Sequence, residues 1–402
     1  MRASQIFGLL AASAFTLLAV PAWSASHHPP RRAAQALPKP GHVFIIVLEN
    51  EGYDVTFGRQ SPATYMKRLA RQGALLPNYY GIGHYSLDNY LAMVSGQAPN
   101  PITQADCQDY VDFQQTGTGE HGQALGKGCI FPKGVSTIVN QPEAGGLTWK
   151  GYMEDMGNDP KRESSPCGQP IGHQPDSTQH AKVGDQYAAR HNPFVYFHAI
   201  TDDVAGCDAH VVNFSALAAD LKHERTTPHY VFITPNLCHD GHDPQENEKD
   251  CVDHEPGGLI SANKFLAEQV PAILASPAFK HDGLLIITFD EADFDTRSDE
   301  KARQKHNTLA CCHELPAPNI PPGATVFETP DEGPGVVGPG GGQIGTVLVS
   351  RYIKPGTVSE VPYNHYSMLR SIEDFFDVGH LGYAGQKGLR PFGDDIFTEP
   401  EK

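Results

Sequence analysis

Basic residues are scarce in this sequence. Its 402 residues include 30 Lys and Arg against 47 Asp and Glu, which gives a formal net charge of −17 at pH 7. A protein that binds nucleic acid needs a basic surface to neutralise phosphates, so the charge argues against that function. It also means that any anionic substrate has to enter an acidic protein.

Long hydrophobic runs are missing beyond the N-terminus. One apolar run, residues 6–20, follows Arg2 and precedes small residues at the third and first positions before Ala25. This pattern is typical of a secretory signal peptide, and the run is short for a membrane span. We therefore expect a signal peptide at residues 1–24, a flexible Pro- and Ala-rich lead-in at residues 25–40, no transmembrane segment, and a secreted or periplasmic protein.

The eight cysteines contain no Cys-x-x-Cys pair, which argues against a zinc site made of thiolates. An even number of cysteines in an exported protein indicates disulfides instead. Their order suggests the bridges Cys107–Cys129, Cys167–Cys207 and Cys238–Cys251, although order alone does not determine pairing. The adjacent Cys311 and Cys312 form either a vicinal ring or the ends of two different bridges.

Buried strands alternate with helices along the chain. Continuous apolar, β-branched runs predict strands at His42–Leu48, 229–234, Gly283–Phe289 and 344–350, with a weaker run at 193–200. Amphipathic patterns predict helices at 63–74, 88–95, 213–222, 260–275 and His365–Phe376. This alternation indicates an α/β fold, a doubly wound and mostly parallel sheet with helices on both faces.

The domain organisation follows from the same pattern. We expect one catalytic domain at residues 41–390 and a C-terminal tail at residues 391–402. Residues 100–180 and 292–343 are rich in Gly, Pro and polar side chains and are too long for ordinary connections. They are predicted to be loop insertions that cover a site. No internal repeat is evident, and the sequence makes no prediction of oligomeric state.

Polar residues follow three of the predicted strands directly. Glu49-Asn50 follow the first, Asp290-Glu291 follow the third, and the segment HDGHD at residues 239–243 comes shortly after the second. Ligands in open α/β sheets bind outside the carboxyl ends of the strands. We therefore expect these three clusters to line one pocket rich in carboxylates and imidazoles.

These clusters offer ligands for a divalent metal ion. Taken alone, Glu49-Asn50 could equally be a strand-end turn, and Asp290-Glu291 could equally cap a turn. The HDGHD segment is the stronger signal, because two His and two Asp within five residues cannot all be buried without partners. Together the clusters indicate a metal site, with Zn, Ca, Mg, Mn and Fe all open.

Ser86, in GIGHYSLDNYLAMVSG, is the candidate nucleophile. It lies at or just before the start of a predicted helix, where free N–H groups favour a developing anion, and a metal there would activate its hydroxyl. On local sequence alone an ordinary helix N-cap explains Ser86 better. No Gly-x-Ser-x-Gly elbow surrounds it, which argues against a serine esterase of the α/β-hydrolase fold.

The ordered motifs resemble one known family. In chain order they are HVFIIVLENEGYDVTFG, HYSLDNYLAMVSG, RHNPFVYF, FITPNLCHDGHD, LLIITFDEAD, GGGQIGTVLVSRYIKPGT and NHYSMLRSIEDFF. This series resembles the secreted bacterial phosphoesterase family, which holds acid phosphatases and phospholipases C and is related to the alkaline phosphatase superfamily. The resemblance covers about residues 42–382. It implies an alkaline-phosphatase-like core with long loop insertions.

The resemblance also implies roles for particular residues. The implied catalytic residues are Ser86, His242 and His365. The implied substrate-binding residues are His84, Asn89 and His191. The implied metal ligands are Glu49, Asn50, Ser86, Asp240, Asp243, Asp290 and Glu291. The chain departs from the family pattern at Asp88, where the family often has Pro, and at His239, where the family more often has Asn.

The resulting hypothesis is a secreted, metal-dependent acid phosphatase that hydrolyses phosphate monoesters through a phosphoserine. Its substrate would be a small phosphorylated molecule, such as a phosphoinositide or a nucleotide. If histidines protonate the leaving group, its pH optimum lies on the acid side of neutrality. The bound cation would largely neutralise five pocket carboxylates, which would let a dianionic substrate enter.

Three alternatives stay open. The first is a phospholipase C or other phosphodiesterase that acts on phospholipid head groups, although the polar composition of residues 100–180 favours monoesters. The second is a non-catalytic secreted metal-binding protein, which explains the 20 histidines but not a serine at a helix start. The third is a non-catalytic relative of the fold.

Overall fold

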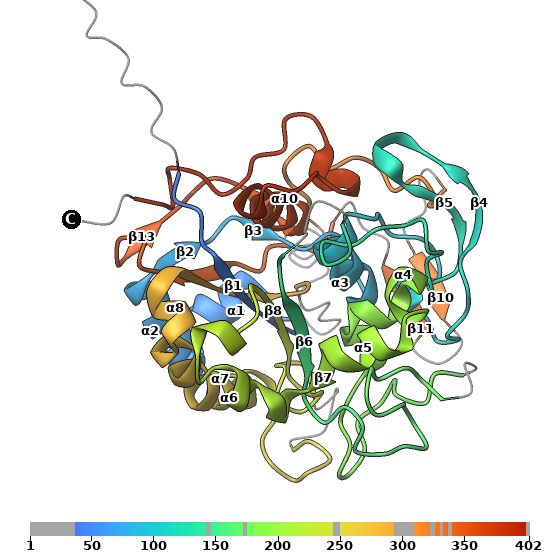
Figure 1. Cartoon of the computed structure of the whole chain (residues 1–402), viewed down its shortest axis with the longest axis horizontal. Helices are drawn as coiled ribbons and strands as arrows, with labels where there is room; N and C mark the ends of the chain where they lie inside the picture. The colour runs from blue at the N-terminus through green and yellow to red at the C-terminus, as the bar shows by residue number, and fades with distance from the viewer. Residues whose placement is uncertain are drawn as a thin grey trace, which may run out of the picture. The chain divides into compact units, whose positions relative to one another are not determined.

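An eight-stranded sheet forms the centre of the fold (Figure 1). Its strands are β1 (His42–Leu48), β2 (Ala74–Leu76), β6 (Trp149–Met153), β7 (Val211–Asn213), β8 (Tyr230–Thr234), β9 (Gly283–Phe289), β12 (Thr346–Ser350) and β13 (Thr357–Val358). Their spatial order is β13-β2-β12-β9-β1-β8-β6-β7. β12 runs antiparallel to its neighbours β9 and β2, and the other neighbouring pairs are parallel. The predicted mostly parallel α/β sheet is confirmed.

The structure is a computed structural model that describes the chain from residue 37 to residue 398, except residues 142–145, 172–174, 244–249, 293–308, 322–325, 330–332 and 337–339. The predicted signal peptide and residues 25–36 of the predicted lead-in lie outside the described residues. From Leu37 onwards the chain forms one compact unit. Phe392, Ile396 and Phe397 are buried, so this packed unit includes the described part of the predicted C-terminal tail.

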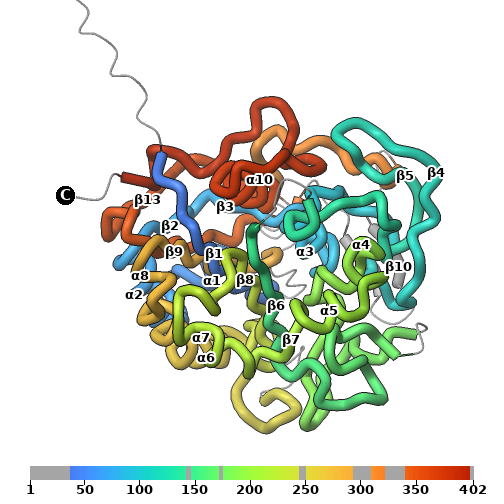
Figure 2. The backbone as a smooth tube through the Cα atoms, viewed as in Figure 1, coloured from blue at the N-terminus to red at the C-terminus, as the bar shows by residue number. Residues whose placement is uncertain are grey.

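The strands at the middle of the sheet are buried over their whole length. Every residue of β1, β8 and β9 is buried, as expected for continuous apolar strands covered on both faces. The helices α2 (Thr64–Gln72), α7 (Gly258–Ala275) and α8 (Pro277–Asp282) cover one face (Figure 2). On the other side, α3 (Ser86–Ser95) packs against α10 (His365–Phe376).

The remaining elements are short and lie outside the main sheet. The helices are α1 (Tyr53–Phe57), α4 (His198–Thr201), α5 (Val204–His210) and α6 (Leu217–Asp220). The strand pairs outside the main sheet are β3 (Tyr79–Tyr80) with β14 (Tyr363–Asn364), β4 (Gln114–Thr118) with β5 (Ala124–Lys127), and β10 (Val326–Thr329) with β11 (Gly333–Val336). Of the long polar insertions, residues 100–180 supply both the β4–β5 hairpin and β6, a strand of the main sheet between β8 and the edge strand β7. The sequence did not predict either.

One predicted strand is wrong, and one predicted helix is shorter than expected. The weak strand at residues 193–200 is a 3-10 turn, Pro193–Tyr196, followed by α4. Pro193 occupies the first helical position, and the apolar residues after it are buried without joining the sheet. The helix predicted at residues 213–222 is confirmed in part. Asn213 ends β7 and caps a 3-10 turn, Phe214–Ala216, by accepting a hydrogen bond from Ser215 N–H, and this turn continues into the short α6.

All eight cysteines form disulfides. The pairs Cys107–Cys129, Cys167–Cys207 and Cys238–Cys251 are those that chain order suggested, and Cys311–Cys312 is the vicinal ring. Among the helices of the described chain, none is long and apolar enough to cross a membrane.

Candidate active site

The three strands that carry the predicted clusters are neighbours. β1 lies between β8 and β9 and is parallel to both, so all three carboxyl ends reach the same edge of the sheet. Backbone hydrogen bonds continue past the strands: Glu49 N–H donates to the Asp240 carbonyl at 2.9 Å, and Asp290 N–H donates to the Leu48 carbonyl at 2.9 Å. The topology therefore brings together the clusters that the sequence placed at three separate strand ends.

Ser86 is held against a buried carboxylate. Its Oγ donates to Glu49 Oε2 at 2.6 Å, and the Tyr90 hydroxyl donates to Glu49 Oε1 at 2.6 Å. Ser86 and Tyr90 are one turn apart on α3, so the same helix face holds both oxygens of Glu49. The cap position of α3 belongs to Tyr85, with a φ of 74°, and Ser86 is the first helical residue. The N-cap interpretation of Ser86 is therefore wrong.

Asn50 and Asp290 complete a cluster of oxygen atoms around Glu49. Asp290 Oδ1 accepts from the backbone N–H of Asn50 at 3.0 Å and of Glu291 at 2.7 Å, while its Oδ2 is buried without a hydrogen-bond partner. One terminal atom of the Asn50 amide lies 2.8 Å from Glu49 Oε2 and 3.2 Å from Asp290 Oδ1. As nitrogen, this atom would donate to both carboxylates. As oxygen, it would face two acceptors, which only a cation among the three would stabilise.

The carboxyl groups of this cluster have pKa values well away from the ordinary range. Burial raises the pKa of Glu49 well above its usual value, and the charges of Asp290 and Asp240 raise it further. Burial also raises the pKa of Asp290 to about 6 and that of Asp240 well above its usual value. All three side chains are fully buried, and buried negative charges are costly without a partner. A cation bound among these oxygens would compensate them.

His191 lies between Glu49 and Asp240. Its Nε2 lies 3.3 Å from Glu49 Oε2 and its Nδ1 lies 3.7 Å from Asp240 Oδ2. The imidazole stacks on the Tyr90 ring, with centroids 5.2 Å apart and planes inclined by 9°. Burial lowers its pKa well below the usual value, and nearby Arg190 lowers it further, so the ring is neutral near pH 7.

The HDGHD segment divides between the site and the surface. Asp240 is buried, accepts from His242 N–H at 3.0 Å through Oδ1, and has no hydrogen-bond partner at Oδ2. His242 and Asp243 follow it and are partly exposed; burial and the charge of Arg190 lower the pKa of His242 to about 4. His239 instead pairs with Glu154, its Nδ1 2.9 Å from Oε1.

His84 and Glu291 form a second buried pair next to the nucleophile, in which His84 Nδ1 contacts Glu291 Oε2. Asp88 lies close by and is also buried; its Oδ1 accepts from the Asn89 amide at 3.0 Å, and its Oδ2 has no hydrogen-bond partner. Burial raises the pKa of Asp88 well above its usual value, and the Glu291 charge raises it further. Asp88, at the position where the family often has Pro, therefore adds a buried carboxyl group beside Ser86.

Asn89 and His365 have their polar atoms occupied by protein partners. The Asn89 side chain accepts from Ile82 N–H at 2.7 Å and donates to the carbonyls of Gly83 and Tyr85. His365 donates through Nε2 to the Asp290 carbonyl at 2.5 Å and accepts at Nδ1 from the Tyr79 hydroxyl at 3.2 Å. Burial lowers the pKa of His365 to about 4. In this arrangement both side chains hold backbone that carries the site.

Sequence reasoning missed three residues of the site. The sequence pattern predicts Tyr90 only as an apolar position of a helix. Its spacing of four from Ser86 is the signal that places both side chains on one helix face. Asp106, from the insertion after α3, accepts from Leu87 N–H at 2.9 Å and so satisfies the first turn of the helix. Arg190 reaches Asp106, with Nε 3.7 Å from Oδ2. Nothing in the local sequence around Asp106 indicates this contact.

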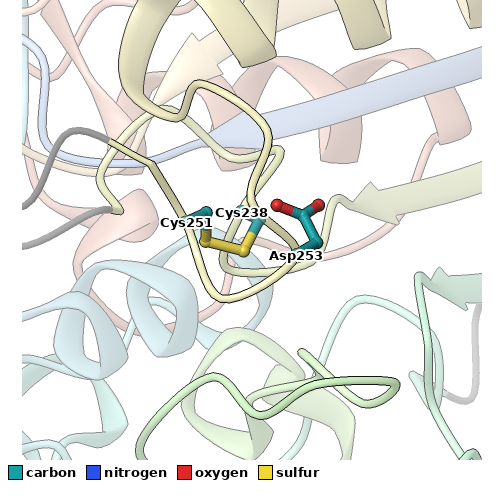
Figure 3. A group of neighbouring side chains, drawn as sticks. All are labelled: Cys238, Cys251 and Asp253. Carbon is teal, nitrogen blue, oxygen red and sulfur yellow. A yellow bond between two sulfur atoms is a disulfide. The ribbon is translucent and has the colours of Figure 1, made fainter.

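A different cluster of donor atoms does not form a metal site. Figure 3 shows Cys238, Cys251 and Asp253, the group of three His, Cys, Asp or Glu side chains in the described residues whose donor atoms lie within 4.8 Å of one another. The two sulfurs are joined in a disulfide, so neither can act as a thiolate ligand. The oxygen cluster at Glu49 differs in kind, because an amide and a hydroxyl supply its additional donors.

Comparison with known proteins identifies the family of the chain. The Phosphoesterase family model matches residues 59–379, and the chain belongs to the Phosphoesterase family. It is 29% identical to a phosphate-repressible acid phosphatase of Penicillium chrysogenum over 57% of this chain and 43% of that protein. It is 25% identical to a phosphatidylinositol-3-phosphatase of Mycobacterium tuberculosis over 95% of this chain and 91% of that protein.

The fungal relatives are much longer than this chain, which spans about half the length of the acid phosphatases it matches. Among solved structures, the chain is similar to a protein of the alkaline phosphatase superfamily from Vibrio parahaemolyticus. The TM-score is 0.47 and the identity 12%, over 90% of this chain and 73% of that one.

Proposed function

We propose that this protein is an exported, metal-dependent phosphomonoesterase of the acid phosphatase type, with Ser86 as its nucleophile. The observation that carries the proposal is the 2.6 Å hydrogen bond from Ser86 Oγ to the buried Glu49 carboxylate, at the start of α3 and beside Asn50 and Asp290. Membership of the Phosphoesterase family and relatives named as acid phosphatases support it. The four disulfides support export to an oxidising compartment.

The oxygen cluster fits a divalent cation. Four side chains place oxygen donors at the same edge of the sheet: Glu49, Asn50, Ser86 and Asp290. The buried Asp290 Oδ2 has no hydrogen-bond partner, and a cation bound here would compensate it. Oxygen donors of this kind suit Mg²⁺, Ca²⁺ or Mn²⁺. When bound, such an ion lowers the pKa of the Ser86 hydroxyl and offsets charge on the phosphoryl oxygens. In this proposal Asp240, Asp243 and Glu291 add negative charge around it.

The protein groups then have the following roles. Ser86 Oγ attacks phosphorus in line with the leaving oxygen, and its proton passes to Glu49 Oε2, which already accepts it. The positive end of the α3 helix dipole stabilises the developing charge. His191 and His84 donate to phosphoryl oxygens. The more accessible His242 protonates the leaving oxygen at acid pH, because its lowered pKa of about 4 leaves the ring neutral near pH 7. Water then hydrolyses the phosphoserine and restores the hydroxyl.

We assign Asn89 and His365 to positioning. Asn89 fixes the loop that ends at Ser86, and His365 holds the backbone carbonyl of Asp290. A phosphoinositide is a candidate substrate, because the Mycobacterium tuberculosis relative that matches most of this chain is named for a phosphoinositide monoester.

A matched substrate panel tests the proposal. The purified mature protein is assayed with an aryl phosphate monoester, the corresponding bis-aryl diester and a phosphoinositide, before and after chelation and reloading with Mg²⁺, Ca²⁺ or Mn²⁺. We expect monoester hydrolysis that is lost on chelation and restored by one of these ions. Faster turnover of the diester would favour a phosphodiesterase or phospholipase C. Tight metal binding with no turnover of any ester would favour a non-catalytic metal-binding protein.

A further inference from the structure

Tyr90 contacts both halves of the site at once. It is fully buried on α3 and donates to Glu49 Oε1 at 2.6 Å. Its ring stacks on His191, and Phe232 of β8 packs edge-on against it, with centroids 6.2 Å apart. The central sheet thus fixes the tyrosine, and the tyrosine contacts a proposed metal ligand and a proposed phosphate-binding histidine.

The two hydrogen bonds to Glu49 differ in what happens to them during the reaction. The bond from Ser86 depends on the hydroxyl proton, which Ser86 loses when it attacks phosphorus. The bond from Tyr90 to the other carboxylate oxygen does not depend on that proton. The Tyr90 contact with Glu49 can therefore persist when Ser86 has lost its proton.

The orientation of His191 depends on the same side chain. Its Nε2 is buried without a hydrogen-bond partner, and its two ring nitrogens face different carboxylates at 3.3 and 3.7 Å. A rotation of the imidazole out of its plane would move both nitrogens away from these carboxylates. The parallel Tyr90 ring opposes that rotation and keeps the imidazole in the plane that contains both contacts.

We propose that Tyr90 is a positioning residue with two separable functions: its hydroxyl orients Glu49 for metal binding, and its ring orients His191 for the phosphate. The inference rests on the proposed function. Groups that hydrogen-bond to metal ligands typically contribute about 10–100-fold to metal affinity or activity. A tyrosine that served the core alone would contribute to stability without changing either property.

Two substitutions separate these functions. Tyr90→Phe removes the hydroxyl and keeps the ring, whereas Tyr90→Leu removes both. Tyr230→Phe is the matched control, because Tyr230 is also buried, its hydroxyl has no hydrogen-bond partner, and it lies at the opposite end of β8. Each full-length mature variant is titrated with Mn²⁺ by calorimetry and assayed for monoester hydrolysis at saturating Mn²⁺.

We expect Tyr90→Phe to lower Mn²⁺ affinity about 10–100-fold with KM unchanged at saturating metal. Tyr90→Leu should show the same loss of affinity and, in addition, a KM raised about tenfold, equivalent to one hydrogen bond to the phosphate. Tyr230→Phe should match the wild type in both. If Tyr90→Leu does not fold, Tyr90→Met serves the same comparison.

The outcomes are distinct. Wild-type Mn²⁺ affinity in Tyr90→Phe would overturn the role of the hydroxyl, and equal KM values in the Phe and Leu variants would overturn the role of the ring. Either result, with an active, metal-binding wild type, would leave the proposed function intact. A wild type that binds no divalent ion would contradict the proposed function and this inference together.

Discussion

Ser86 Oγ and Glu49 Oε2 are 2.6 Å apart, although the two residues are 37 positions apart in the chain. The contact joins the first residue of α3 to the first residue after the central strand β1. It turns the serine away from capping its own helix and towards the oxygen cluster at the sheet edge. The predictions below follow from this contact and from the charges that surround it.

Removal of the Ser86 hydroxyl should abolish turnover. Ser86→Ala should lower kcat for an aryl phosphate monoester about 10³-fold or more, because it removes the oxygen that attacks phosphorus in the proposed mechanism. Steady-state kinetics measure the effect. The control is Ser95→Ala on the same helix, whose side chain donates to the Leu91 carbonyl. Comparable activity in Ser86→Ala and the wild type would refute the assignment.

Bound metal should stabilise the fold. An ion that binds only the native state adds about 2.7 kcal/mol to the free energy of unfolding at a concentration 100 times its dissociation constant. Thermal unfolding of the chelated protein, with and without added Mn²⁺, measures the effect. Asp290→Asn should lose most of the increase, whereas Asp374→Asn, a change on exposed α10 surface, should keep it. An unfolding midpoint that no divalent ion moves would count against the metal site.

Asp88 should oppose the binding of a dianionic phosphate. Its carboxyl group is buried beside Ser86 and close to Glu291, with one oxygen unpartnered. Asp88→Asn removes the ionisable group at nearly constant volume. We expect a lower KM for monoesters at pH values where the Asp88 carboxyl group is ionised, and a higher free energy of unfolding at neutral pH. Kinetics and denaturant unfolding give the two values. A marked loss of Mn²⁺ affinity would instead identify Asp88 as a metal ligand.

Glu373 should make the fold less stable as the pH rises. Burial in α10 raises the pKa of Glu373 to about 9, from an ordinary value near 4.5. Between these values the native state holds a proton on Glu373 that the unfolded state has lost. The part of the free energy of unfolding that depends on Glu373 is therefore greatest below pH 4.5 and falls until about pH 9. Glu373→Gln keeps the acceptor for Leu381 N–H and removes the charge.

Thermal unfolding at pH 5 and pH 8 tests this prediction. From pH 5 to pH 8 the midpoint temperature of unfolding should fall more in the wild type than in Glu373→Gln. Glu268→Gln, on the exposed surface of α7, is the control and should behave like the wild type. Parallel pH dependence in the wild type and Glu373→Gln would show that Glu373 does not supply the effect.

The sequence predicted the sheet best where strands are buried on both faces. β1 and β9 have the predicted bounds, because a continuous run of apolar, β-branched residues is typical of a strand buried on both faces. β6 was missed because Trp149–Met153 has little apolar periodicity and gains its place by pairing with β8. The apolar residues after Pro193 were taken for a strand because periodicity alone does not separate a buried turn from a buried strand.

The sequence predicted the part of the site that follows from strand topology. Parallel neighbours bring Glu49, Asp240 and Asp290 to one edge, which follows from their positions after strands. Side-chain partners do not follow from such positions. The pairing of His239 with Glu154 and the support of α3 by Asp106 depend on packing between segments far apart in the chain.

The most direct test of the central claim is to locate the phosphoryl group on the enzyme during turnover. The mature protein is mixed with a monoester, quenched in acid, digested and mapped by mass spectrometry, with Ser86→Ala treated identically. The account predicts one added phosphoryl group on Ser86 and none in the variant. A phosphoryl group on another residue, or an unmodified Ser86 in enzyme quenched during turnover, would contradict it.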